Sequence, residues 1–545
     1  MKKEEWNQGL NHLDSGLVEE YVKKKETLAK RRAARALWMR MGVIAARVCV
    51  LVSSVLVVPM LSRQMPGGEP EQSTEDSTVE DTSTEDSSEQ LIAPPRFPKF
   101  NDEELQFFSW ELAFPEYIHE KNYTPTTVID RELYDRCDYT ETLLNVKTKW
   151  TFSDASSENL FDGPDSILHA EDYDLIICDD GTAVDLMTRG LFSNLLQYKY
   201  MGFWHPSWSS SLTENLAVGD KLYFATGSVS LNFLMQASVV FFNKDLVKTL
   251  DVREKIQNNW DEQDLYELVA SGKWTLDKMI TLSQGAYLDQ NENKTPDAGD
   301  RCGFSTHAAM VDNFYYSGGY TTVVSDGDTW SIHSAFLEAD VMDPLLAAVN
   351  GLLHTSKDGV LESDALAAQT AFANGNALFA LATASDAYEH YRKQESLAYS
   401  VLPMPKHSET QTAYAAVPLS GYSVYGICSQ SDIPEITSTF LQVFAEESYE
   451  IIRPALLDVL MRGRYAEDPE DTEMWETAID ANVLDAGRVF ASYFGETRTD
   501  CLTTTLFRAA VEQNTAAWSD AIDPYKASLA QYATYLAGMI AVLPN

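Results

Sequence analysis

A stretch from Pro66 to Gln90 divides the chain into two parts of different character. Its 25 residues include nine acidic side chains and no basic or aromatic ones. Such a segment cannot bury enough apolar surface to offset the cost of ordering its backbone, so we predict a solvated linker over 63–99. Residues 100–545, which follow it, have the apolar content of a folded domain. The sequence therefore predicts an anchor, a tether and a working domain.

Residues 41–62 are apolar and about long enough to cross a bilayer, which takes roughly 20 residues. Arg47 interrupts this segment, and the shorter run after it also suits the core of a signal peptide. Both alternatives stay open. We favour a retained transmembrane anchor, because neither a small-x-small cleavage site nor a lipoprotein-type cysteine follows the run.

The charge distribution predicts the orientation of this anchor. Residues 1–64 hold twelve Lys or Arg against six Asp or Glu, and most of the basic residues lie in the head formed by residues 1–40. A basic flank stays in the cytoplasm, so we expect the C-terminal domain outside the cell, held at the cell membrane. The chain carries −41 and residues 1–64 carry +6, which leaves −47 on the remainder. This acidic domain repels nucleic acid, and we exclude a DNA or RNA partner.

The cysteines show no paired spacing and no C-x-x-C motif, so we predict neither a disulfide scaffold nor a zinc site. We expect isolated thiols buried in a large core, at Cys49, Cys137, Cys178, Cys302, Cys428 and Cys501.

Short apolar strands alternate with amphipathic helices after residue 100. Strands are predicted at Leu105–Trp110, Asp174–Cys178, Ser238–Phe242, Ala377–Leu381, Ser400–Pro403 and Ser423–Cys428. Helices are predicted at Arg131–Leu144, Ala183–Arg189, Asp264–Ser271, Thr275–Ala286, Ala339–Leu353, Ile433–Glu447 and over most of the tail from Thr472. This alternation predicts α/β units with largely parallel sheets and a helix-rich C-terminal part.

Seven phrases follow one another in an order that resembles a known family. They are DRELYDRCDYTETLLNVKTKW (130–150), YDLIICDDGTAVDLMTRGLFSNL (173–195), GDKLYFATGS (219–228), ASVVFFNKDL (237–246), GKWTLDKM (272–279), FANGNALFAL (372–381) and VLPMPK (401–406). Together they resemble the extracellular solute-binding proteins of family 1, the maltose-binding-like receptors of ABC importers. The resemblance covers about residues 104–450.

This resemblance implies a two-lobed, periplasmic-binding-protein-like (type II) clamshell with hinge strands and a ligand held between the lobes. FFNK and LPMPK would cross between the lobes. Lobe 1 would then comprise about 100–237 and 405–450, and lobe 2 about 238–404 and 451–545. No cofactor is required, and the partners would be a small solute and the permease subunits.

Ligands of open α/β sheets bind beyond the carboxyl ends of the strands, where Asp179 and Asp180 follow YDLIIC. Both carboxylates could accept hydrogen bonds from sugar hydroxyls, although Asp180 could instead cap the helix that starts near Thr182. Trp204 and Trp208 lie in a loop rich in Pro and Ser and could stack on sugar C–H groups, with core packing as the alternative.

Three further candidates lie in segments that the resemblance assigns to the cleft: Gln236 before the crossover strand, His307 and Tyr422. One departure concerns the ligand. Maltodextrin binders carry a Trp and an Asp-Arg pair at positions that are Cys178, Gly181 and Thr182 here. Malto-oligosaccharide is therefore not the favoured ligand, although a carbohydrate is.

A second candidate site follows the calcium-loop spacing of EF-hands. DQNENKTPDAGD places oxygen donors at loop positions one, three, five, seven, nine and twelve, which are Asp289, Asn291, Asn293, Thr295 (through its carbonyl), Asp297 and Asp300. Lys294 stands where the sharp turn favours Gly, and Asp300 has a shorter arm than Glu. A structural Ca²⁺ and an ordinary polar turn both remain open.

The sequence gives little support for a catalytic function, because the chain has no H-E-x-x-H motif, no G-x-S-x-G motif and no phosphate loop. We therefore expect a binding protein rather than an enzyme. The favoured function is a membrane-anchored solute receptor of an ABC transporter that captures a carbohydrate. A surface sensor or scaffold that signals through the basic head, and a surface glycoside hydrolase, are the alternatives.

Overall fold

The computed structural model describes residues 97–110, 113–118, 125–153, 173–217, 219–297, 299–325, 330–461, 469–490 and 501–542. The predicted head, the predicted anchor and Cys49 lie outside these residues, as does the predicted linker up to residue 96. No helix in the described part of the chain is both long and apolar enough to cross a membrane.

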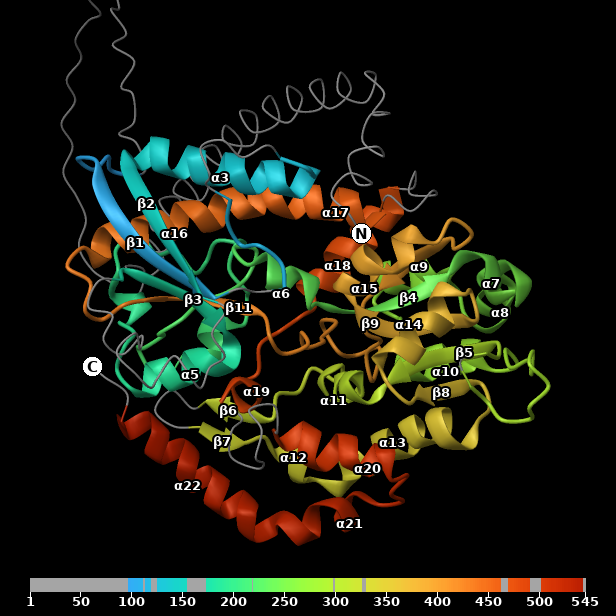
Figure 1. Cartoon of the computed structure of the whole chain (residues 1–545). Coiled ribbons are helices and arrows are strands. Elements are labelled where there is room, and N and C mark those ends of the chain that lie inside the picture. The colour runs from blue at the N-terminus through green and yellow to red at the C-terminus, as the bar shows by residue number, and fades with distance from the viewer. Residues whose placement is uncertain are drawn as a thin grey trace, which may run out of the picture. The chain divides into compact units, whose positions relative to one another are not determined.

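The first lobe is built on a four-stranded sheet in the order β11-β3-β1-β2 (Figure 1). Strands β1, β2 and β3 are parallel, and β11 runs antiparallel to β3, with Ser423 opposite Asp179. Helices α3 and α16 pack against each other, and α5 packs on β3 and β11. The bounds are β1 Glu103–Trp110, β2 Val146–Ser153, β3 Leu175–Asp179, β11 Ser423–Ile427, α3 Val128–Leu144, α5 Asp180–Thr188, α6 Leu231–Met235 and α16 Pro434–Glu447.

The second lobe is built on a five-stranded sheet in the order β10-β4-β9-β5-β8. Strands β5, β8 and β9 are parallel to one another, and β4 is antiparallel to β9 and β10. The strands are β4 Ser238–Asn243, β5 Cys302–His307, β8 Gly359–Glu362, β9 Ala377–Thr383 and β10 Tyr399–Leu402. Every residue of β4 and β9 is buried, which explains their near-continuous apolar sequences.

Short helices connect these strands, and further helices follow at the C-terminal end. In the middle of the chain they are α7 Lys244–Thr249, α8 Val252–Asn259, α9 Leu265–Ala270, α10 Leu276–Ser283, α11 Asn313–Tyr316, α12 Ser334–Leu337, α13 Ala339–Asn350, α14 Ala365–Ala373 and α15 Ala384–Glu389, with a hairpin of β6 Val323–Ser325 and β7 Trp330–Ile332. The C-terminal helices are α17 Arg453–Met461, α18 Pro469–Asp480, α19 Ala486–Val489, α20 Ala509–Glu512, α21 Trp518–Ile522 and α22 Lys526–Val542.

These two sheets confirm the predicted two-lobed α/β fold with a helix-rich C-terminal part. The predicted strands and helices all have counterparts, with ends that differ by a few residues. The return crossing comes later in the chain than LPMPK, because the segment after it still packs on lobe 2. Lys406 pairs with Thr275, and the Tyr414 hydroxyl donates to the carbonyl of Val269 at 3.0 Å.

The chain segments that pass between the lobes meet at one buried polar junction. Ser238, at the start of β4, donates its N–H to Asn482 Oδ1 at 2.8 Å and its hydroxyl to the carbonyl of Val417 at 2.7 Å. Asn313 accepts from the N–H of Val417 at 2.9 Å and donates to Ser238 Oγ at 3.1 Å. Segments far apart in the sequence are thereby joined.

A buried carboxylate organises lobe 1 around the same region. Glu116, which is 4% exposed, accepts six hydrogen bonds, from Ser230 Oγ, the N–H of Leu231, the N–H and Nδ2 of Asn232, Ser423 Oγ and the Tyr425 hydroxyl, at 2.6–3.1 Å. The segment after β1 is thus tied to the start of α6 and to β11.

Replacing Glu116 by Ala would leave these donors without an acceptor in the protein interior. Because each unsatisfied buried group costs roughly 1–3 kcal/mol, we expect Glu116→Ala to lower the free energy of unfolding by about 3–5 kcal/mol. Urea titration of the full chain measures this. The control is Glu104→Ala on β1, an exposed residue expected to change stability by about 0.5 kcal/mol or less. A loss below about 1 kcal/mol for Glu116→Ala would contradict the role given to this carboxylate.

Candidate interlobe site

The carboxyl ends of the parallel strands of lobe 1 carry the two predicted carboxylates. Asp179 is the last residue of β3, and its side chain accepts from the N–H of Thr182 at 3.0 Å and from the Thr182 hydroxyl at 2.7 Å. Asp179 is therefore the N-cap of α5. The sequence had offered Asp180 for this role, but the helix already begins at Asp180, so the cap lies one residue earlier.

Asp180 is instead buried at the start of α5, with 8% exposure. Its Oδ1 accepts from the N–H of Gly421 at 3.0 Å, and Gly421 has a φ of 93°, a conformation that favours glycine. Burial raises the pKa of Asp180 to about 6, the charge of Asp179 adds to this effect, and Gly421 and Arg488 oppose it. Asp180 thus changes its charge close to neutral pH.

The parallel strands of lobe 2 end at an edge that faces lobe 1. Thr383, at the end of β9, pairs with Ser238 at the junction, and His307 ends β5 in the same direction. Two aromatic rings that follow strand ends in different lobes, Phe114 and Tyr388, meet edge to face with centroids 5.9 Å apart. The carboxyl edges of both sheets therefore converge, as expected for a ligand site between lobes.

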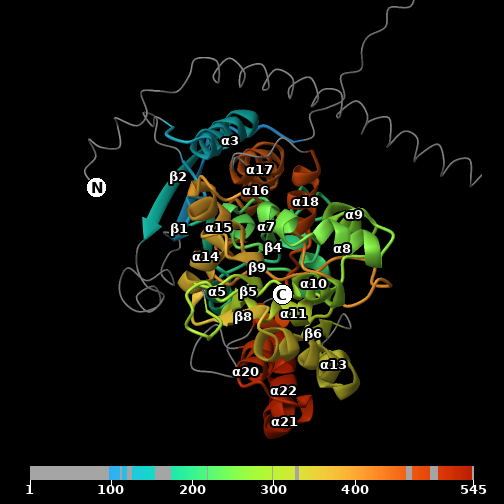
Figure 2. The same ribbon diagram turned by 90° about the vertical axis from the view of Figure 1, so that its right-hand side faces the viewer.

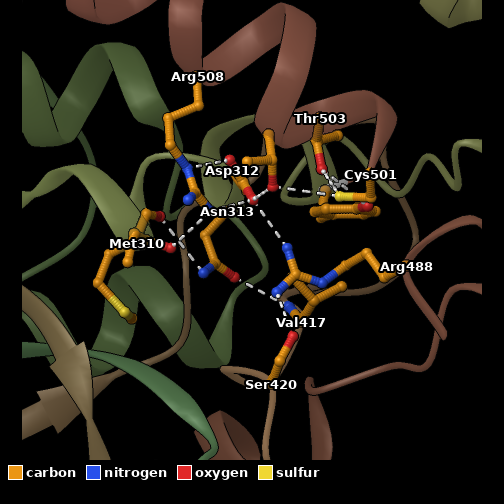
Figure 3. A network of polar contacts seen from close by, with 12 residues as sticks. Met310, Asp312, Asn313, Val417, Ser420, Arg488, Cys501, Thr503 and Arg508 are labelled. Carbon is orange, nitrogen blue, oxygen red and sulfur yellow. Dashed lines mark hydrogen bonds and ion pairs between the residues drawn. The ribbon is translucent and has the colours of Figure 1, made fainter. Parts of the chain in front are cut away.

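A charge network lies beside this junction (Figure 3). Asp312 is fully buried and binds two guanidinium groups, Arg488 at 2.8 Å and Arg508 at 2.6 Å. Arg488 belongs to α19, which packs on both α5 of lobe 1 and β6. Its second nitrogen approaches the Ser420 hydroxyl at 3.4 Å. The C-terminal part thus links the lobes through Arg488.

Three other predicted ligand residues, Trp204, Trp208 and Gln236, differ from one another in burial. Trp204 is 77% exposed, whereas Trp208 is 3% exposed and donates its indole N–H to Gln442 at 3.0 Å. Trp208 is thus a core residue of lobe 1. Gln236 is half-buried at the end of α6, and its carbonyl accepts from the N–H of Leu419 at 2.9 Å.

Tyr422 lies next to Asp180, whose N–H donates to its carbonyl at 3.2 Å, and His307 lies near Arg508 of the charge network. His307 is half-buried, and burial lowers the pKa of its imidazole. Tyr422 is 4% exposed, and its ring packs edge to face on Phe233 at 5.3 Å. The structure thus groups Asp179, Asp180 and Tyr422 at the end of β3, and places His307 at the corresponding edge of lobe 2.

The sequence analysis missed an aromatic surface near the carboxyl end of β2. Trp150 stacks on Tyr117 with ring centroids 3.5 Å apart, and Phe152 follows at 6.2 Å in a nearly parallel orientation. Phe152 is 52% exposed. Trp150 and Phe152 are two residues apart on an edge strand, so the sequence could have predicted that their rings share one face. Tyr117 joins this surface only through tertiary structure.

The predicted calcium loop lies between α10 and β5 and wraps around its own polar groups. Asp289 accepts from the N–H of Lys294 at 2.9 Å, and Asn291 accepts from that of Asn293 at 3.0 Å. Lys294 has a φ of 68°, so it adopts the left-handed conformation for which the loop position favours glycine. The side chains of Asn291 and Asn293 both donate to Asp297.

The other two positions of this loop are Thr295 and Asp300. The N–H of Thr295 donates to Asn293 at 2.7 Å, and Asp300 is fully buried and accepts from the N–H of Gln290 at 3.0 Å. Within the described residues, no group of three or more His, Cys, Asp or Glu side chains is arranged to hold a metal ion. Calcium binding therefore stays a prediction that depends on amide and backbone oxygens as well.

Comparison with known proteins gives distant structural similarities. The chain is similar to the ABC substrate-binding protein Lmo0181 from Listeria monocytogenes in complex with cycloalternan, with 13% identity, a TM-score of 0.45, and 79% of this chain and 99% of that chain covered. A second is the maltose/maltodextrin-binding domain MalE from Bdellovibrio bacteriovorus bound to maltotriose, with 12% identity, a TM-score of 0.42, and coverage of 80% and 98%.

A third similar structure is maltose-bound T. maritima MalE3, with 14% identity, a TM-score of 0.44, and coverage of 79% and 99%. A scan against protein-family models gives no match, and a search of curated proteins gives none either. Similarities this distant do not assign a ligand. The fold assignment rests on the strand order and crossings of the chain itself.

The raised pKa of Asp180 predicts how the stability of the fold depends on pH. Because the folded state holds this proton more tightly than the unfolded state, the contribution of Asp180 to stability falls as pH rises from about 4 to about 6. Asp180→Asn removes this effect. As pH rises from about 4 to about 6, we expect the free energy of unfolding of the variant to rise by about 2–3 kcal/mol relative to that of the unmodified chain. Above about pH 6 this difference should stay constant.

Urea unfolding of both chains between pH 4 and 7 measures this difference. Asp138→Asn, at an exposed position on α3, controls for the loss of one negative charge. A difference between the Asp180 variant and the unmodified chain that does not change with pH would contradict the assigned pKa.

Proposed function

We propose that this chain is a membrane-anchored extracellular solute-binding protein that captures a carbohydrate between its lobes and delivers it to an ABC permease. The observation that carries the proposal is the convergence of the carboxyl edges of two separate sheets at a junction of crossing segments. Such a junction allows hinge closure, for which the ligand supplies the differential free energy. The seven phrases in the family's order support the same function.

The chemistry at the lobe 1 edge suits a hydroxyl-rich ligand. Asp180 has one oxygen bound to Gly421, so its other oxygen can accept from a sugar hydroxyl. The exposed ring of Phe152, next to the stacked pair of Trp150 and Tyr117, offers a flat apolar surface for sugar C–H groups. We propose that these residues, together with Asp179, His307 and Tyr422, contact the ligand, and that Gln236 and Trp204 border the site.

The N-terminal part of the proposal rests on the sequence alone. The basic head and the apolar segment would hold the receptor at the outer face of the cell membrane, and the acidic linker would keep the lobes away from the anionic surface. A receptor tethered to the same membrane stays close to its permease, which raises the effective concentration of the receptor at the permease.

A thermal-shift screen of the full chain tests the ligand class. The panel contains mono- and oligosaccharides, peptides and polyamines. We expect one saccharide to raise the melting temperature, because a ligand present at 100 times its Kd adds about 2.7 kcal/mol of stability. Asp180→Asn and Phe152→Ala should each reduce the shift. The control Tyr139→Ala, an exposed aromatic residue on α3, should leave it unchanged. Stabilisation by a peptide or polyamine alone would contradict the carbohydrate class, and stabilisation by none of the panel would contradict a solute-binding function.

We also propose that the loop formed by residues 289–300 binds a structural Ca²⁺. The left-handed turn at Lys294 and the Asp289 contact across it support this proposal. We expect CaCl₂ to raise the melting temperature of the unmodified chain, as measured by calorimetry, and not that of Asp289→Asn. Glu292→Gln, in the same loop but outside the six ligand positions, should respond like the unmodified chain. An absence of calcium heat in isothermal titration would refute the proposal.

A further inference from the structure

A polar groove of about 450 Å³ lies on lobe 2, away from the elements that carry the interlobe site. Figure 2 turns α8 and α10, which carry part of its lining, toward the viewer. The groove is lined by the C-terminal end of α8, by the loop of Trp260 and Glu262, by Lys278 on α10, and by Glu409 in the return segment.

Glu262 provides an acceptor that no described residue uses. Its side chain is 5% exposed, and Oε1 binds the Lys273 ammonium at 2.5 Å. Its second oxygen, Oε2, is buried and has no hydrogen-bond partner among the described residues. Burial is the largest single influence and raises the pKa of this carboxyl, but the contact with Lys273, a backbone hydrogen bond and the charge of Lys278 together hold the pKa below its usual value. The group is therefore ionised at neutral pH, and an unpaired ionised oxygen is costly.

Trp260 gives the same groove an aromatic wall. The ring is half-buried, and the Lys278 ammonium lies 5.3 Å from its centroid. Lys278 is held in place, because it also donates to Glu409 at 2.6 Å and to the carbonyl of Lys273 at 2.9 Å. An indole beside an acceptor is a combination that sugar recognition uses, since the part of the ring that Lys278 leaves uncovered can meet C–H groups while the acceptor binds a hydroxyl.

The charges of the groove argue against a cationic ligand. Three carboxylates, those of Asp261, Glu262 and Glu409, face two ammonium groups, those of Lys273 and Lys278. These groups sum to −1, but both ammonium groups already bind a carboxylate, and a cation placed at Oε2 would meet both lysines. A neutral ligand that supplies a hydroxyl donor matches this balance better.

We propose that this groove is a second saccharide-binding site, in which Glu262 Oε2 accepts a sugar hydroxyl and Trp260 stacks on the sugar ring. The Lys273 side chain, which is 37% exposed, keeps its contact with Oε1 and shifts only enough to open a path from the groove to Oε2. The site is independent of the interlobe site and of the proposed transport function. A receptor with such a groove can hold one part of a long glycan on its flank while another part reaches the lobe junction.

Fluorine NMR of the full chain labelled with 5-fluorotryptophan tests this proposal. Trp260→Phe assigns the Trp260 resonance, and maltotriose, cellotriose and chitotriose are the probes. We expect at least one trisaccharide to shift this resonance. The half-saturating concentration should rise about tenfold in Glu262→Gln, because the ionised acceptor is lost while the shape is kept. Glu254→Gln, an exposed position on α8, should bind like the unmodified chain.

Three results would overturn the proposal. The first is a Trp260 resonance that no trisaccharide shifts, or that spermidine alone shifts. The second is an unchanged half-saturating concentration in a Glu262→Gln chain whose melting temperature shows it to be folded. The third is loss of the Trp260 response in Asp180→Asn, because the resonance would then report on the lobe junction. Failure of the interlobe site alone would instead leave the Trp260 response intact.

Discussion

The polar junction at Ser238 is the constraint on which the two-lobed arrangement depends. Ser238, Asn313 and Asn482 belong to segments widely separated in the chain, and they satisfy each other's hydrogen bonds without exposure to water. A shift in the register of any crossing would leave buried amide groups unpaired, at a cost comparable to a good part of a domain's stability. The junction therefore fixes the register of the crossing segments, while each lobe keeps its own sheet.

This junction also explains why the candidate ligand groups come from both lobes. Lobe 1 contributes the end of β3, which Glu116 and β11 hold in position, and lobe 2 contributes the end of β5. Between them, Asp312 is compensated by two arginines from the C-terminal part. The contact with Arg488 ties α19 to Asp312.

Periodicity predicted the fold well where an element is long and buried. The apolar runs of β4 and β9 and the helical pattern of α16 were recognisable. A fully buried strand needs a continuous apolar run, and an amphipathic helix needs apolar residues at helical spacing. The four residues of β8 and the hairpin of β6 and β7 are too short to show a period.

The site was less predictable than the fold. The position of Asp179 at a strand end could be predicted, whereas the burial of Trp208 depends on Gln442, more than 200 residues away. The same holds for the face formed by Tyr117 with Trp150. Contacts of this kind leave no local pattern, so a tryptophan in a polar loop can be a ligand platform or a core residue with the same sequence around it.

The buried thiols have a practical consequence. Cys137, Cys178, Cys302, Cys428 and Cys501 are all free and buried, and burial raises the pKa of Cys137 to about 11. Burial keeps the sulfur atoms of all five away from maleimides and oxidants in solution. A single cysteine engineered on the surface of each lobe could therefore be labelled with a fluorophore pair without removing these five residues, and opening could be followed by energy transfer.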